Sequence, residues 1–179
     1  MNDSLLKGSI VFLALMIVFV SMACVSAESN DTSVLTLSKS GITIKYPSNW
    51  GYSDSLSSYS IMAISKADSV DSFGVGQVNI NIEKKPFDGD FGTFVNSTYE
   101  PMKNNNNYDL VSSGPSMIAG HEALEYIYTS NQNNVVKEHK AVWFEKGGQA
   151  YVLLYSAPVD KFDSNLYVFD YILSDIQIT

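Results

Sequence analysis

Arginine is absent from the 179-residue sequence, and eleven lysines face nineteen acidic residues, which gives a net charge of −8. Arginine supplies most bidentate recognition of phosphate groups and guanine edges. A protein that binds the nucleic-acid backbone also needs a basic patch to attract it. The composition therefore argues against the nucleic-acid-binding classes, and we expect no nucleic-acid partner.

Cysteine is almost absent as well. The single residue, Cys24, lies in an apolar N-terminal stretch, so the remainder of the chain has no thiol for a disulfide, a paired-cysteine zinc site or a nucleophile. Stability must come from packing, for which 45% apolar residues, rich in Phe and Tyr, provide the material. The length suits one domain.

Residues 8–25 form a long run without charge, GSIVFLALMIVFVSMACV, which follows Lys7. The small residues after this run are typical of a secretory signal, with cleavage expected after Ala27. An uncleaved membrane anchor through residues 8–25 is an alternative, because about 18 apolar residues can just span a bilayer. Lipidation of Cys24 is a third, because Ser21-Met22-Ala23 before it resembles a lipoprotein box that lacks the large aliphatic residue.

All three interpretations place residues 28–179 outside the cytoplasmic membrane, either secreted or tethered to its outer face. We expect residues 28–40 to form a short tether and a first strand, and residues 41–179 to form the domain proper. The triplets beginning at Asn30 and Asn96 fit the N-glycosylation pattern.

The clearest structural pattern lies near the C-terminus, where two strand-like runs flank Gly147-Gly148. This pair supplies the positive φ angles of a tight hairpin turn. The run Tyr151 to Tyr155 is apolar throughout, as expected of a strand in mid-sheet. The helix that follows places one apolar stripe against the sheet: Phe162, Leu166, Phe169, Leu173 and Ile176.

Upstream, the patterns predict several strands, a helix capped by Asp88 or Asp90 that ends or kinks near Pro101, and further strands. In the run 77–84, Val78, Ile80 and Ile82 are expected to face inward, and the alternating Gln77, Asn79, Asn81 and Glu83 to face solvent. Hairpin-length connections favour an α+β fold, with an antiparallel sheet covered by helices.

Three short stretches resemble PsbP-like domains: GITIKYPSNW at 41–50, AGHEA at 119–123 and YSAP at 155–158. The resemblance covers about residues 41–178. It implies an α/β/α sandwich with a central antiparallel sheet flanked by helices, in an exported and often lipid-tethered protein. Photosynthetic members of this family assist the oxygen-evolving complex and help retain calcium and chloride. This chain lacks their basic character, and no metal-binding residue carries over; Pro101 and the run Asn104–Asn107 also depart from the pattern.

Catalytic residue types are scarce, since the predicted domain has only two histidines. His121 lies in a turn and His139 in a strand, where it is expected to face solvent. No Gly-x-Ser-x-Gly elbow accompanies them. A hydrolase that uses His121 is the alternative function, and it requires Ser or Asp within hydrogen-bond reach.

Hard-cation ligands are present only as two acidic pairs, Asp88 with Asp90 and Asp68 with Asp71. Neither pair has EF-hand spacing, and helix capping explains the first equally well. We therefore expect no cofactor and no metal ligand, with a calcium-stabilised binding module as a further alternative.

Six aromatic residues are either core residues or the lining of a partly wet ligand pocket: Trp50, Tyr126, Tyr128, Trp143, Tyr151 and Tyr155. Tyr167 and Tyr171, which lie off the helix stripe, are weaker candidates for a protein contact. The leading functional prediction is an exported, non-catalytic domain that binds an envelope protein or a small ligand.

Overall fold

The computed structural model describes residues 33–53, 57–132 and 135–179. The predictions for residues 8–25, Cys24, Ala27 and Asn30 lie outside these residues. The described strands are β1 (Val34–Lys39), β2 (Ile42–Pro47), β3 (Trp50–Ser53), β4 (Ser60–Lys66), β5 (Asn79–Pro86), β6 (Tyr108–Ile118), β7 (His121–Gln132), β8 (Val135–Lys146), β9 (Gln149–Pro158) and β10 (Gln177–Ile178). The helices are the 3₁₀ turn η1 (Ala67–Ser69), α1 (Phe91–Lys103) and α2 (Val159–Asp175).

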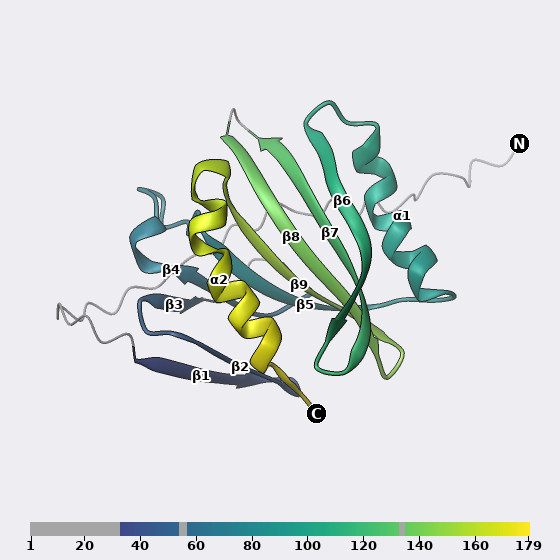
Figure 1. Cartoon of the computed structure of the whole chain (residues 1–179), viewed down its shortest axis with the longest axis horizontal. Helices are drawn as coiled ribbons and strands as arrows, with labels where there is room; N and C mark the ends of the chain where they lie inside the picture. The colour runs from purple at the N-terminus through teal and green to yellow at the C-terminus, as the bar shows by residue number, and fades with distance from the viewer. Residues whose placement is uncertain (1–32, 54–56, 133–134) are drawn as a thin grey trace, which may run out of the picture.

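Two antiparallel sheets make up the fold (Figure 1). The larger has the order β3-β4-β5-β9-β8-β7-β6, and the smaller has the order β1-β2-β10. In the larger sheet, β3–β5 and β6–β9 are each consecutive antiparallel runs, and the pairing of β5 with β9 joins them. The chain leaves β5, forms α1, and returns through β6, β7 and β8 before it reaches β9.

Tight turns form where the sequence supplies positive φ angles. Gly147 and Gly148, with φ of 59° and 69°, connect β8 to β9 and pair Lys146 with Gln149. Both central residues of a two-residue type I′ turn need positive φ, which glycine adopts without steric cost. The predicted hairpin at this position is confirmed.

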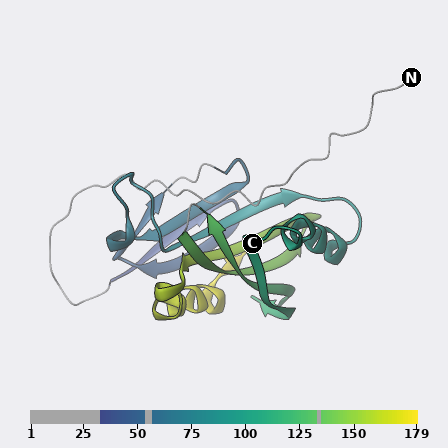
Figure 2. The same ribbon diagram turned by 90° about the horizontal axis from the view of Figure 1, so that it is seen from above.

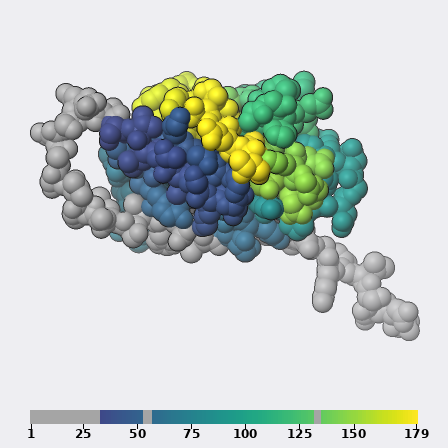
Figure 3. Space-filling model, turned by 90° about the horizontal axis from the view of Figure 1, so that it is seen from below, coloured from purple at the N-terminus to yellow at the C-terminus, as the bar shows by residue number. Residues whose placement is uncertain are grey.

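The two faces of the large sheet are covered differently. Helix α1 packs on one face, whereas α2 and the strand β2 pack on the other (Figures 1 and 2). The space-filling view shows β1 and β2 against the C-terminal end of the chain (Figure 3), in line with the pairing of β10 with β2. The predicted α+β class and antiparallel sheet are therefore confirmed, but the sandwich only in part, because a small sheet shares one outer layer with α2.

Helix α2 uses the predicted stripe and extends it. Phe162, Phe169 and Ile176 are buried, while Leu166 and Leu173 pack partly buried against the same core. Val168 and Ile172 are buried as well, because α2 contacts both β2 and the strands β8 and β9 of the large sheet and so buries a face wider than one stripe. The hydroxyl of Tyr155 on β9 donates a 2.8 Å hydrogen bond to the Phe162 carbonyl and thus ties helix to sheet.

Helix α1 begins as the sequence predicts. The carboxylate of Asp90 accepts hydrogen bonds from the Thr93 backbone N–H at 2.8 Å and from its hydroxyl at 2.9 Å, which satisfies a free donor of the first turn. Pro101 is accommodated inside the last turn, and the helix ends at Lys103. Trp143 on β8 donates its indole N–H to the Tyr99 hydroxyl at 2.8 Å and thereby fixes α1 on the sheet.

Truncation of Phe169 to alanine should lower the free energy of unfolding by about 3–5 kcal/mol, since this fully buried ring would leave a cavity between α2 and the sheet. Tyr167→Ala on the solvent side of the same helix is the control, with an expected change within about 0.5 kcal/mol. Urea unfolding of both variants measures the difference. Equal losses would show that α2 is not held by its apolar stripe.

Candidate functional site

The six aromatic residues considered as a pocket lining do not form one group. Tyr126, Tyr128 and Trp143 lie in the core beneath α1, whereas Trp50, Tyr151 and Tyr155 lie in the core on the opposite face of the sheet. All six are at least nine-tenths buried. Because the sheet separates the two groups, the six side chains cannot line a common cavity.

The polar side of β5 is buried, so the prediction that it faces solvent is wrong. Asn79 and Asn81 are 1% and 0% exposed, and Glu83 and Lys85 are nearly as buried. Hydrogen bonds connect these side chains: Ser60 donates to Asn81 at 2.6 Å, and Asn81 donates to Glu83 at 3.1 Å. Alternation identified the two faces of the strand correctly, but it could not show that protein covers both.

Glu83 and Lys85 form a buried ion pair on this strand. Their charged atoms are 2.8 Å apart, with side-chain exposures of 7% and 9%. The Lys85 ammonium also lies 5.4 Å from the ring centre of Tyr59 and 5.6 Å from that of Trp143. Such a pair stabilises the fold only while both partners remain, since one buried charge alone is very costly.

His139 is also buried, although the sequence predicts a solvent-facing histidine. One ring nitrogen lies 2.8 Å from the Ser130 hydroxyl and the other 2.7 Å from the Ser156 hydroxyl, and the ring stacks on Tyr128. Burial, assisted by the Lys137 charge, lowers the pKa of His139 to about 3. The lowered pKa favours the neutral imidazole, whose two serine contacts connect the neighbouring strands β7, β8 and β9.

His121 has none of the contacts that the hydrolase hypothesis requires. It is half-buried at the first position of β7, after the Ala119-Gly120 turn, and its ring lies 6.0 Å from that of Phe144. Within the described part of the chain, its ring forms no hydrogen bond with a serine or a carboxylate. The geometry therefore gives no support to a nucleophile–base pair at this position.

The acidic pairs proposed for calcium have local structural roles. Asp90 caps α1, and Asp71 accepts hydrogen bonds from the backbone N–H groups of Phe73 and Val75. Asp68 is exposed and lies 3.3 Å from Lys66. Among residues 33–53, 57–132 and 135–179, no three His, Cys, Asp or Glu side chains are grouped to hold a metal ion.

An open groove of about 710 Å³ lies where the start of α1 meets the β6–β7 turn. Apolar side chains from three elements line it, namely Phe91, Pro115, Met117 and Leu124. The register places Pro115 opposite Leu124 and Met117 opposite Glu122, so these four residues project from adjacent strands toward α1. A groove of this size is large enough to hold several side chains of a partner.

Three carboxylates surround this apolar lining. Asp90 lies at the start of α1, and Glu122 and Glu145 flank the cross-strand pair Ala123–Phe144, which places them on neighbouring strands. In the part of the chain that the structure describes, no lysine forms an ion pair with any of the three. Like charges this close repel one another, so the groove is electrostatically suited to a cationic group. The sequence offers no signal for it, since its residues come from four separate segments.

The remaining predicted surface features are exposed. Tyr167 and Tyr171 face solvent on α2. Asn96 is exposed on α1, where its side-chain oxygen accepts a 2.6 Å hydrogen bond from the Tyr126 hydroxyl. No helix among the described residues is long and apolar enough to cross a membrane.

The described elements define a small α+β domain with two antiparallel sheets and two α-helices. Comparison with family models matches the PsbP-like protein family over residues 21–178, and the chain belongs to this family. Comparison with curated proteins finds no match.

Two solved structures share the fold at low identity. Cyanobacterial PsbP (CyanoP) from Synechocystis sp. PCC 6803 has a TM-score of 0.60 at 14% identity, over 88% of this chain and 99% of that one. LpqN of Mycobacterium tuberculosis, which is involved in cell envelope biogenesis, has a TM-score of 0.59 at 16% identity, over 84% and 92%. At these identities the likeness establishes the fold.

Lys85→Met should lower the free energy of unfolding by about 3–5 kcal/mol, because it leaves the buried Glu83 carboxylate without its counterion. The double variant Lys85→Met with Glu83→Gln should lose less free energy of unfolding than Lys85→Met alone, because no buried charge is left unpaired. Lys103→Met, which removes the exposed partner of Glu100, should cost less than about 1 kcal/mol. Urea unfolding of the three variants measures these values, and a double variant as unstable as Lys85→Met would contradict the argument.

Acidification from pH 6.5 toward pH 3 should destabilise the protein in part through His139. The pKa of His139 is lowered in the folded state, so as the pH falls the unfolded chain binds a proton at this residue before the folded protein does. The contribution of neutral His139 to the free energy of unfolding, on the order of several kcal/mol, is therefore lost across this window. His139→Gln should therefore show a shallower fall in thermal midpoint with pH than the unsubstituted protein. His121→Gln serves as the control and should keep the steeper slope; parallel profiles for all three proteins would disprove the assignment.

Proposed function

We propose that this chain is an exported, non-catalytic binding protein that is held at the outer face of the cytoplasmic membrane and recognises an envelope protein. The uncharged run at residues 8–25 supports export and attachment. Membership of the PsbP-like family supports a domain of this kind. Within the same fold, LpqN is involved in cell envelope biogenesis, which agrees with an envelope role for this chain.

The acidic, apolar-lined groove between α1 and the β6–β7 turn is the single observation that carries the recognition step. It combines apolar area from Phe91, Met117 and Leu124 with the carboxylates of Glu122 and Glu145, which form no ion pair with a lysine among the described residues. Apolar burial supplies binding free energy, and charge complementarity selects the partner and its orientation. A partner segment that presents lysine or arginine beside an apolar side chain satisfies both requirements.

A protein segment suits this groove better than a small ligand. Binding sites for small molecules usually enclose most of the ligand surface. This groove is open, and Met117 on its wall is largely exposed. An extended or helical segment of a second protein can cover such an open surface, whereas a small organic cation would leave much of it exposed to water.

Membrane attachment is tested by fractionation of cells that produce the full chain. We expect the protein to remain with the membranes through a high-salt wash, because an apolar segment or a lipid holds it there and salt screens only charge contacts. Intact-mass analysis of the membrane-bound form distinguishes a retained segment from a lipidated Cys24. Recovery of a form cut after Ala27 in the culture medium alone would refute the attachment.

The groove is tested by affinity capture from native membranes with the unsubstituted protein as bait. Glu122→Gln with Glu145→Gln should abolish capture of the specific partner, since it removes the charge that selects a cationic group. Asp109→Asn with Asp163→Asn removes the same charge from exposed sites outside the groove lining and should leave capture unchanged. Equal capture by both double variants would rule the groove out as the binding surface.

A further inference from the structure

Four exposed apolar side chains lie at the end of the large sheet opposite the groove: Phe73, Val135, Val136 and Val159. We call them the apolar rim. Phe73 is 82% exposed, and the three valines are each more than two-fifths exposed. They come from the loop after η1, the first residues of β8 and the first residue of α2.

The register shows that these segments meet. Lys137, next to Val136 on β8, pairs with Pro158, which directly precedes Val159. Burial lowers the pKa of Lys137, and the nearby Asp71 carboxylate of the Phe73 loop opposes that change. Lys137 thus pairs with the strand end before Val159, and its charge interacts with the loop of Phe73, so the four side chains lie at the same end of the sheet.

The loop that carries Phe73 is tightly built. A β-bridge joins Val70 to Gly76, and the Asp71 carboxylate accepts hydrogen bonds from the N–H groups of Phe73 at 2.8 Å and Val75 at 3.0 Å. The side-chain amide of Gln77 donates to the same carboxylate at 2.7 Å. A rigid loop that exposes a large aromatic side chain presents it to a partner at little cost in conformational entropy.

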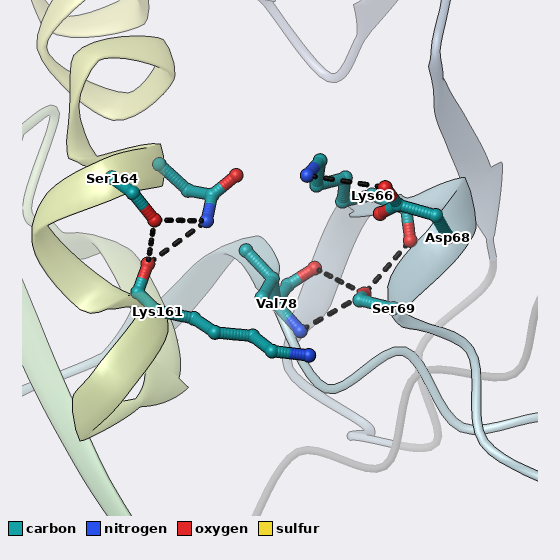
Figure 4. A network of polar contacts seen from close by, with 7 residues as sticks. Lys66, Asp68, Ser69, Val78, Lys161 and Ser164 are labelled. Atoms are coloured by element: carbon teal, nitrogen blue, oxygen red, sulfur yellow. Dashed lines mark hydrogen bonds and ion pairs between the residues drawn. The ribbon is translucent and has the colours of Figure 1, made fainter.

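The base of this loop is also fixed, and Gly76 is packed so tightly that an added Cβ would lie 2.4 Å from that of Ser65. The Ser69 hydroxyl donates to the Lys66 carbonyl at 2.8 Å and accepts from the Val78 N–H at 3.1 Å (Figure 4). These bonds anchor both ends of the segment between β4 and β5. Phe73 is therefore held outward by the structure around it.

The described chain begins at the same end of the molecule. Ser33 accepts a hydrogen bond from Ser48, and the next residue, Asn49, accepts one from Ala67 at the start of η1. The beginnings of β1 and α2 and the η1 loop accordingly lie along one side of the molecule (Figure 1). Only residues 26–32 separate the apolar run 8–25 from Ser33, and seven residues span at most about 25 Å. A membrane-inserted run would thus keep this end of the domain near the lipid surface.

From this arrangement we infer that the apolar rim docks on the lipid bilayer, with Phe73 inserted at the membrane interface. The inference rests on the membrane attachment proposed above and adds the surface that faces the lipid. Charged residues of both signs neighbour the rim in the chain, namely Asp68, Asp71 and Asp160 with Lys66, Lys137 and Lys161. The lipid contact that we infer is therefore the apolar one, made by the four rim side chains.

Fluorescence quenching of Phe73→Trp in the full chain, reconstituted in phosphatidylcholine vesicles, tests this docking. Bromine atoms on the acyl chains quench a tryptophan that is inserted in the lipid, and acrylamide in the water quenches one that is not. We expect Phe73→Trp to be quenched by brominated lipid and protected from acrylamide. Tyr167→Trp, at an exposed position on α2, is the matched control and should show the reverse. Trp50 and Trp143 are buried in both variants and contribute the same background.

Each outcome decides the matter. Vesicle-bound protein in which Phe73→Trp responds to brominated lipid no more than Tyr167→Trp overturns the docking and leaves the proposed attachment intact. Protection from acrylamide without quenching by brominated lipid also overturns it and indicates that the rim is covered by protein, in this system a second copy of the chain. Full-length protein that fails to join the vesicles overturns both the attachment and the docking. Unchanged thermal midpoints for the two variants confirm that the fold is preserved.

Discussion

The pairing of β5 with β9 is the interaction on which the architecture depends. It extends over eight register positions, from Asn79 with Ser156 to Pro86 with Gln149, and joins two runs of consecutive strands into one sheet. Strand β9 pairs on both edges and is covered on both faces, which explains why it is apolar almost without interruption. Without this pairing, α1 and α2 would have no common sheet to cover.

The two hydrophobic cores, one on each face of the large sheet, differ in chemistry. The core beneath α2 and β2 is mainly aliphatic, with a minority of aromatic side chains, whereas nearly half of the core beneath α1 is tyrosine or tryptophan, next to buried polar groups. The hydrogen bond from Trp143 to Tyr99 satisfies two of the polar groups there, while the hydroxyls of Tyr108 and Tyr128 have no partner among the described residues. Because buried polar groups are costly unless paired, this side has fewer alternative packings than an apolar core and holds α1 in one position.

The arrangement also separates two proposed contacts. The groove that contains Glu122 and Glu145 lies at the end of the sheet that carries the β6–β7 and β8–β9 turns. The apolar rim around Phe73 lies at the opposite end, where β5 and β8 begin and β9 ends. A domain that rests on lipid through its rim would therefore direct its groove away from the membrane, toward other proteins of the envelope.

The sequence alone determined the features that depend on neighbours along the chain: the Gly147-Gly148 turn, the Asp90 cap, the stripe of α2 and the short stretches that resemble PsbP-like domains. The turn, the cap and the stripe follow from backbone conformation and side-chain period, which short segments specify, whereas the resemblance rests on likeness to a known family. Tertiary structure alone decided that Asn79, Asn81 and His139 are buried, that the six aromatic residues divide between two cores, and that four distant segments form a groove. These outcomes depend on what covers each face of the sheet, and that is settled by strand pairing between segments far apart in the chain.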